Sequence, residues 1–280
     1  MDRRSEDSPL ADGDLASDDP NNESAVPRFF VLKPERYPSS TAAGMTSFPL
    51  PSDYARTKRV HSFHELVTTR FADGINALCW ERTLPDGFSE VVEKLGAAEG
   101  IMPLDADRLH SLPLSDAGRA AIDVLLEDQR LLREHGLTPS LDCIQSYPRD
   151  EEPGAVPIDV YSFHADSATV ETDTYLCTYF GPASEGLRNE DARPHVHIPE
   201  TRAKLLRHFG GEDNDDFREY LNECCYDLHY AAALHAQPFS FGLGNLWRIA
   251  VEYPGSPVPP CIHRAPETIP GQPPRLLLIS

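Results

Sequence analysis

The chain has little lysine and a large excess of acidic residues. It carries 25 Lys and Arg against 45 Asp and Glu in 280 residues, so its formal net charge is −20 at pH 7. The basic residues are almost all arginine, and the lysines are only Lys33, Lys58, Lys94 and Lys204. A surface of this charge repels phosphate backbones and anionic lipids. We therefore expect neither a nucleic acid nor a membrane as a partner.

Cysteine pairs and long apolar runs are also missing. None of the six cysteines belongs to a C-x-x-C pair, and a chain of this size does not need a disulfide framework. No apolar run approaches the roughly 20 residues that cross a bilayer. The first residues, Met1-Asp-Arg-Arg-Ser-Glu-Asp-Ser8, lack the apolar core of a signal peptide. These absences predict a soluble, cytoplasmic protein with reduced thiols.

Three common catalytic motifs are absent as well. There is no H-E-x-x-H sequence, which argues against a zincin metalloprotease. There is no G-x-S-x-G nucleophile elbow and no phosphate-binding loop. The 11 histidines of the chain are the remaining candidates for site chemistry.

The composition predicts an acidic tail followed by one domain. Residues 1–27 are rich in Asp, Glu, Ser, Asn and Pro and have few large apolar residues. Such a segment cannot bury enough surface to offset its ordering entropy, so we predict a disordered tail. Residues 28–58 combine a short apolar patch with several prolines and are expected to form an extended arm. We expect residues 28–280 to form a single domain.

Apolar periodicity predicts both helices and strands in this domain. The expected helices are 62–71, 89–95, 115–135, 199–209 and 215–236. The expected strands are 75–80, 141–147, 156–163, 172–180, 239–253 and 275–279. The last two helices fall in a stretch, about 183–238, where the β pattern is interrupted. We interpret this stretch as a helical insertion that covers the mouth of a site.

His164 and Asp166 form a His-x-Asp pair at the end of the predicted strand 156–163. Side chains two residues apart on an extended strand point to the same side, so this pair can hold one ion. A second imidazole has to come from elsewhere, and His263 is well placed to supply it. Two neutral imidazoles and one carboxylate make the 2-His-1-carboxylate facial triad, which suits Fe(II) and leaves positions open for substrate and O2. We interpret the three residues as the ligands of a non-haem Fe(II) site.

Two arginines follow His263 and are candidates for binding a carboxylate. Arg275 lies twelve residues after His263 and begins an apolar strand. A guanidinium there could hold the far carboxylate of a 2-keto acid through a two-pronged, charge-assisted contact, and Arg264 is the alternative anchor. A hydroxyl on strand 172–180, from Thr178 on one face or Tyr175 on the other, could bind the inner carboxylate of the cofactor. Both side chains could equally just fill a half-buried strand.

His195 and His197 form a rival pair with the same spacing, and His208 lies beyond them. Pro194 and Pro199 flank this pair in a stretch without a strand pattern. We therefore rank it below the His-x-Asp pair as a metal site.

Several segments together resemble one protein family. They are Ile75-Asn-Ala-Leu-Cys-Trp-Glu-Arg82, Phe163-His-Ala-Asp166, Leu176-Cys-Thr-Tyr-Phe-Gly-Pro182, His263-Arg-Ala-Pro266 and Arg275-Leu-Leu-Leu278. Over about residues 60–280 the chain resembles the bacterial domain of unknown function 1826 family. The pattern is similar to that of Fe(II)/2-oxoglutarate-dependent oxygenases. This resemblance implies a mainly β fold, with a double-stranded β-helix (jelly-roll, cupin-like) core supported by N-terminal helices and a helical insertion.

The resemblance also implies an activity. It predicts a dioxygenase that uses Fe(II), 2-oxoglutarate and O2 to hydroxylate a small molecule. Arginines in the insertion, Arg188, Arg193, Arg202 and Arg207, favour an anionic substrate, although solvated helix faces routinely carry such arginines. Two alternatives stay open: a metal-binding barrel that senses or interacts without turnover, and a fold remnant that acts only through interaction.

Overall fold

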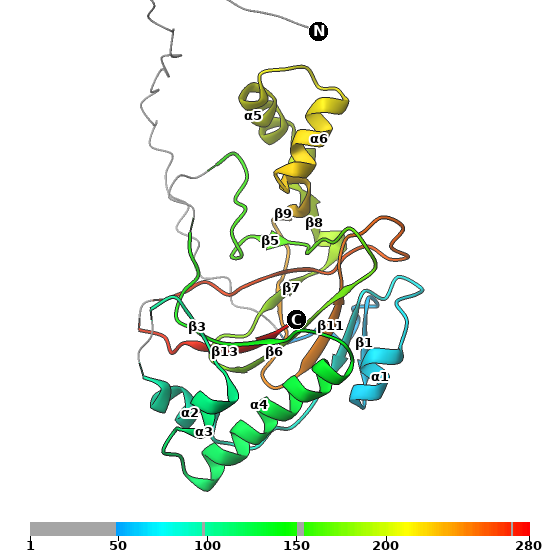
Figure 1. Ribbon diagram of the computed structural model, residues 1–280. Helices are drawn as coiled ribbons and strands as arrows, with labels where there is room; N and C mark the ends of the chain where they lie inside the picture. The colour runs from blue at the N-terminus through cyan, green and yellow to red at the C-terminus, as the bar shows by residue number, and fades with distance from the viewer. Residues whose placement is uncertain (1–48, 97–98, 150–153, 270) are drawn as a thin grey trace, which may run out of the picture. The chain divides into compact units, whose positions relative to one another are not determined.

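Two β-sheets carry the predicted site residues, and helices cover one of them (Figure 1). The computed structural model describes residues 49–96, 99–149, 154–269 and 271–280, all within one compact unit, Gly44–Ser280. The predicted acidic tail, residues 1–27, and most of the predicted arm lie outside the described residues. The described part is mainly β and includes six α-helices. No helix in this part of the chain has both the length and the apolar character to cross a bilayer.

The larger sheet has seven strands in the described part of the chain, in the order β1-β2-β11-β6-β13-β4-β3. Their bounds are β1 (Thr57–Val60), β2 (Ala77–Trp80), β3 (Ile101–Pro103), β4 (Ser140–Ile144), β6 (Asp173–Phe180), β11 (Leu246–Ala250) and β13 (Arg275–Ile279). Only β1 and β2 pair in parallel. Side chains alternate between the two faces, so each strand has one face toward the helices and one toward the smaller sheet.

The smaller sheet has six strands among the described residues, in the order β10-β7-β12-β5-β9-β8, all paired antiparallel. Their bounds are β5 (Phe163–His164), β7 (Glu185–Leu187), β8 (Ala192–Pro194), β9 (His229–Ala232), β10 (Phe239–Ser240) and β12 (Ile262–Arg264). The predicted strand 156–163 is therefore much shorter than expected. The predicted strand 239–253 is split into β10 and β11 at Gly242 and Gly244, whose φ angles of +74° and +76° favour glycine.

Four strand pairs are nested in the chain. β4 pairs with β13, β5 with β12, β6 with β11, and β7 with β10. The segment from β4 to β7 therefore pairs, strand by strand, with the returning segment from β10 to β13. This nesting makes neighbours of β5 and β12, which carry the two predicted imidazole ligands.

The interval between β7 and β10 is less helical than expected. It contains the helices α5 (Pro199–Phe209) and α6 (Asp215–Glu223), but also β8 and β9. The predicted helix 215–236 is wrong after Glu223, because the chain then turns through Cys225, whose φ is +56°. Residues of β9 find hydrogen-bond partners in β5 and β8 instead, so long-range pairing overrides the local helical pattern.

The remaining helices are α1 (Phe63–Thr68), α2 (Phe88–Leu95), α3 (Ala106–His110) and α4 (Asp116–Glu134). Predicted helix 62–71 begins as expected, because the Ser62 side chain accepts a hydrogen bond from the Glu65 N–H and the Glu65 carboxylate accepts one from the His61 N–H. Figure 1 shows α4 crossing the larger sheet. Its apolar face, with Ile122, Leu125 and other buried residues, packs in the main core cluster against β4, β6 and β13.

A buried ion pair joins α4 to this sheet. Both terminal nitrogens of Arg82 lie 2.7 Å from the Asp128 carboxylate, and Tyr179 donates to the same carboxylate at 2.6 Å. The two charged side chains are only 9% and 3% exposed. Removing one partner of such a pair leaves a buried charge uncompensated.

We expect Asp128→Ala to lower the free energy of unfolding by about 3–5 kcal/mol, measured by urea denaturation. Asp123→Ala removes an exposed carboxylate from the same helix. This control is expected to change the free energy of unfolding by less than about 0.5 kcal/mol. Similar losses in the two variants would contradict this assignment of the ion pair.

Candidate metal centre

Strand register brings the three predicted ligands together. His164 on β5 and His263 on β12 are direct cross-strand partners, with ring centroids 4.6 Å apart. Nε2 of His164 lies 3.8 Å from Oδ1 of Asp166, and Nε2 of His263 lies 3.8 Å from Oδ2 of the same carboxylate. All three candidate ligand atoms lie within 4.8 Å of one another. Ligand bonds of about 2.0–2.2 Å are long enough for one ion to reach atoms at such separations.

Backbone carbonyls orient the two imidazoles. Nδ1 of His164 donates to the Ser162 carbonyl at 2.8 Å, and Nδ1 of His263 lies 3.4 Å from the Cys261 carbonyl. Each ring therefore keeps its proton on Nδ1 and turns the lone pair of Nε2 toward Asp166. This is the tautomer that an Nε2 metal ligand requires.

The electrostatics of the site suit a cation. Burial, followed by the nearby His263, lowers the pKa of His164 to about 4, so this ring is neutral at pH 7. Burial alone would raise the pKa of Asp166, but His263, the hydrogen bond from Thr174 and His164 together lower it. The carboxylate is therefore ionised. A neutral imidazole beside an ionised carboxylate is the state in which both groups bind a metal.

Arg275 is a buried cation that lacks a carboxylate partner. It is 5% exposed, and burial lowers its pKa. Its guanidinium donates only to hydroxyls: to Tyr147 at 3.0 Å, to Ser184 at 2.8 Å and to Thr178 at 3.4 Å. Among the described residues no acid lies within ion-pair distance, and Nε of Arg275 is buried without a hydrogen-bond partner. Buried charges are normally paired, so this guanidinium is suited to an anionic ligand.

The structure separates Arg275 from the alternative anchor, Arg264. The Arg264 guanidinium contacts the Glu185 carboxylate, with Nε at 2.8 Å and a terminal nitrogen at 2.7 Å, and lies over the Phe163 ring. Because Arg264 follows His263 on β12, its side chain points to the opposite face of the sheet. Arg264 is therefore paired and directed away from the metal ligands.

The two hydroxyl candidates on β6 also lie on opposite faces. Thr178 contacts the Arg275 guanidinium. Tyr175 belongs to the core cluster between the larger sheet and its helices, so the prediction that it binds a cofactor carboxylate is not supported. The alternation of side chains along β6 thus places Thr178, and not Tyr175, on the face toward Arg275.

One cavity of about 150 Å³ connects the metal ligands with Arg275. It is lined by Tyr147, Val160, His164, Asp166, Leu176, Ser184, His263, Ala265, Arg275, Leu277 and Ile279. A cavity of this volume can hold a molecule the size of benzene. The lining of the cavity thus combines the three candidate ligands and Arg275 with apolar side chains such as Leu176 and Leu277.

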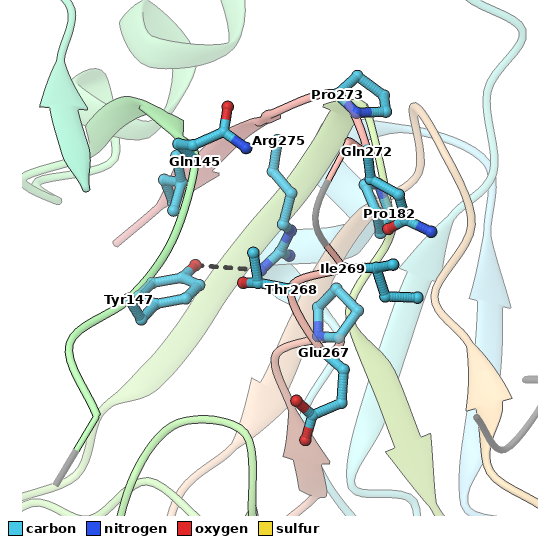
Figure 2. A pocket seen from close by; sticks show the side chains of 11 residues that line it. Gln145, Tyr147, Pro182, Glu267, Thr268, Ile269, Gln272, Pro273 and Arg275 are labelled. Atoms are coloured by element: carbon cyan, nitrogen blue, oxygen red, sulfur yellow. Dashed lines mark hydrogen bonds between the residues drawn. The ribbon is translucent and has the colours of Figure 1, made fainter. Parts of the chain in front are cut away.

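A second, smaller pocket lies on the other side of the Arg275–Tyr147 contact. Figure 2 shows this contact beside Thr268, Gln145 and Gln272. The pocket has a volume of about 20 Å³, enough for about one water molecule. It is too small for an organic acid, so of these two pockets beside Arg275 only the cavity of about 150 Å³ has room for such a ligand.

Four site residues had not been predicted. Tyr147 and Ser184 contact Arg275, and Thr174 donates to Asp166 at 2.6 Å. His229 on β9 is the other cross-strand partner of His164, and its Nδ1 lies 2.8 Å from the Ser162 hydroxyl. Thr174 shares a strand face with Thr178, so alternation could have identified it. His229 lies where a helix was expected, so no pattern in the sequence indicated that it would lie beside His164.

The rival pair His195 and His197 does not form a metal site among the described residues. It lies in a 3-10 turn, η2 (His195–His197), rather than in a strand. With three residues per turn, side chains at positions i and i+2 diverge.

Most of the arginines expected to attract an anionic substrate have partners. Arg188 pairs with Asp53, Arg202 pairs with Asp213, and Arg193 donates to a backbone carbonyl. They therefore add little to the case for an anionic substrate.

No protein-family model, curated protein or solved structure matches the chain in comparisons with known proteins.

Proposed function

We propose that the protein is a non-haem Fe(II)/2-oxoglutarate-dependent dioxygenase that hydroxylates a small molecule. The donor set supports Fe(II), because His164, His263 and Asp166 offer two imidazoles and one carboxylate within ligand distance of one another. A cytoplasmic location fits this proposal. All six cysteines are free thiols, as expected in a reducing compartment.

The single observation that carries the proposal is the guanidinium of Arg275, which has no carboxylate partner among the described residues and lines the same cavity as the triad. A cavity of about 150 Å³ that is lined by both a candidate metal site and a buried cation suits a small dicarboxylate. When bound, 2-oxoglutarate would turn its keto-acid end to His164, Asp166 and His263, and Arg275 would pair with its far carboxylate. Thr178, Ser184 and Tyr147 hold the guanidinium in place by accepting its hydrogen bonds.

The strand pairing favours a jelly-roll, or double-stranded β-helix, as the core. In that fold a long hairpin of eight strands wraps into two facing sheets. The nested pairs β4–β13, β5–β12, β6–β11 and β7–β10 form such a hairpin. Along both arms the strands alternate between the two sheets, except at the β7–β10 closure. The remaining strands extend the sheets at their edges.

In the proposed reaction the iron and the protein have separate roles. When bound, Fe(II) would supply the activation of O2 and the oxidation of a C–H bond, with oxidative decarboxylation of 2-oxoglutarate to succinate and CO2. The protein's own residues orient the cosubstrate and exclude water. Leu176, Leu277 and Ile279 line the cavity wall and limit the water that reaches the site.

The proposal is tested by adding Fe(II) and 2-oxoglutarate to the protein without oxygen. We expect a weak visible charge-transfer band from chelation, followed by succinate when oxygen is admitted. Full iron occupancy with neither band nor succinate would instead favour a metal-binding module without turnover. Failure to bind Fe(II), Co(II) or Zn(II) would exclude both functions.

A further inference from the structure

Thr174 connects the metal site to the opposite sheet. It lies on β6 of the larger sheet, where it pairs with Ile249 of β11. Its hydroxyl donates to Oδ2 of Asp166 at 2.6 Å, a length typical of a strong hydrogen bond to a charged acceptor. The carboxylate ligand is therefore held by the rigid interior strand that faces it.

Asp166 needs such support because it lies just beyond the end of β5 and not within a strand. Its main chain is fixed by one contact, in which the Glu252 N–H donates to the Asp166 carbonyl at 2.8 Å. This contact sets the backbone and leaves the side chain free to rotate. Among the described residues, the hydrogen bond from Thr174 is what orients the carboxylate.

We propose that Thr174 is a positioning residue that holds Asp166 as a single-oxygen ligand of the metal. Oδ1 lies 3.8 Å from Nε2 of His164 and Oδ2 lies 3.8 Å from Nε2 of His263. The hydrogen bond from Thr174 occupies one lone pair of Oδ2, which makes Oδ1 the oxygen that is freer to bind the ion. A carboxylate that binds through one oxygen leaves more coordination positions for cosubstrate and O2 than one that binds through both. This inference rests on the proposed metal site but not on the identity of the substrate.

The test compares three variants by titrating Co(II) into the full chain. Hydrogen-bond partners of metal ligands typically contribute 10- to 100-fold in affinity, so Thr174→Val should weaken Co(II) binding by about that factor. Thr174→Ser keeps the hydroxyl and should restore the affinity to within about threefold of the original. Thr172→Val removes an exposed hydroxyl two residues earlier, just before β6 begins, and serves as the matched control.

The visible spectrum of bound Co(II) gives a second readout, because it reports the coordination number. Thr174→Val should alter this spectrum, since the freed Oδ2 can turn to the metal, whereas Thr174→Ser should not. Unchanged affinity and spectrum in Thr174→Val would overturn the inference while leaving the metal site intact. If the unaltered protein binds no Co(II), the proposed function fails with it. Thermal unfolding of each apo variant distinguishes a local effect from loss of the fold.

Discussion

Replacement of Arg275 by methionine is expected to weaken 2-oxoglutarate binding strongly without destabilising the apo protein. The substitution removes the cation that would pair with the far carboxylate. Truncating one partner of a buried, hydrogen-bonded charge pair costs about 2–5 kcal/mol of binding energy, which is roughly 30- to 5,000-fold in Kd. Titration of 2-oxoglutarate into the Co(II)-loaded protein measures this loss.

We expect the loss of binding in Arg275→Met to occur without a loss of stability. Arg275 is a buried cation with hydroxyl partners only, so folding the apo protein includes the cost of desolvating it. Replacing buried charges with apolar side chains of similar volume is often neutral or stabilising. We expect the free energy of unfolding of Arg275→Met to be unchanged or higher. A fall of more than about 2 kcal/mol would mean that Arg275 is a structural residue.

Arg264→Met is the matched control, with the reverse pattern expected. Arg264 is paired with the buried Glu185 and lies outside the cavity. Its loss should destabilise the protein by on the order of 3 kcal/mol, because Glu185 is left uncompensated. It should leave 2-oxoglutarate affinity nearly unchanged. If Arg264→Met also removes binding, Arg275 cannot be assigned as the specific anchor.

Replacement of His164 by alanine is expected to remove metal binding almost completely. A site with three protein ligands loses one third of its donors, on the order of 4 kcal/mol of a total of about 12 kcal/mol. That corresponds to a loss of about 1,000-fold in affinity, measured by anaerobic titration of Fe(II). The charge-transfer band with 2-oxoglutarate should disappear in the same variant.

His229→Ala is the control for this experiment. His229 is similarly buried and is also a cross-strand partner of His164, with ring centroids 5.7 Å apart. It is not one of the three clustered ligands, so its loss should cost less than about tenfold in metal affinity. Equal losses in the two variants would show that the triad has been assigned to the wrong histidines.

Part of this structure follows from local sequence patterns. The helix α4 begins and ends within one residue of its predicted limits, because its apolar face and its capping residues are all local. The spacing of His164 and Asp166 indicates that they lie on one side of the chain. The sequence also predicted the third member, His263, although its contact with His164 spans almost one hundred residues.

Predictions from local sequence patterns were wrong where long-range strand pairing competes with those patterns. Residues 229–232 continue a helical pattern, yet they form β9 because β5 and β8 offer hydrogen-bond partners. Such partners lie far away in the sequence, so no local window contains the information.

By itself the sequence determined the three candidate metal ligands and the alternation of side chains along the strands. Only the tertiary structure decided which faces meet across the cavity. It placed Arg275 in the cavity and Arg264 against Glu185, and it brought Thr178 to Arg275 and Thr174 to Asp166. The physical reason is that alternation divides a strand into two faces, while the sheet packed against it determines which face is enclosed.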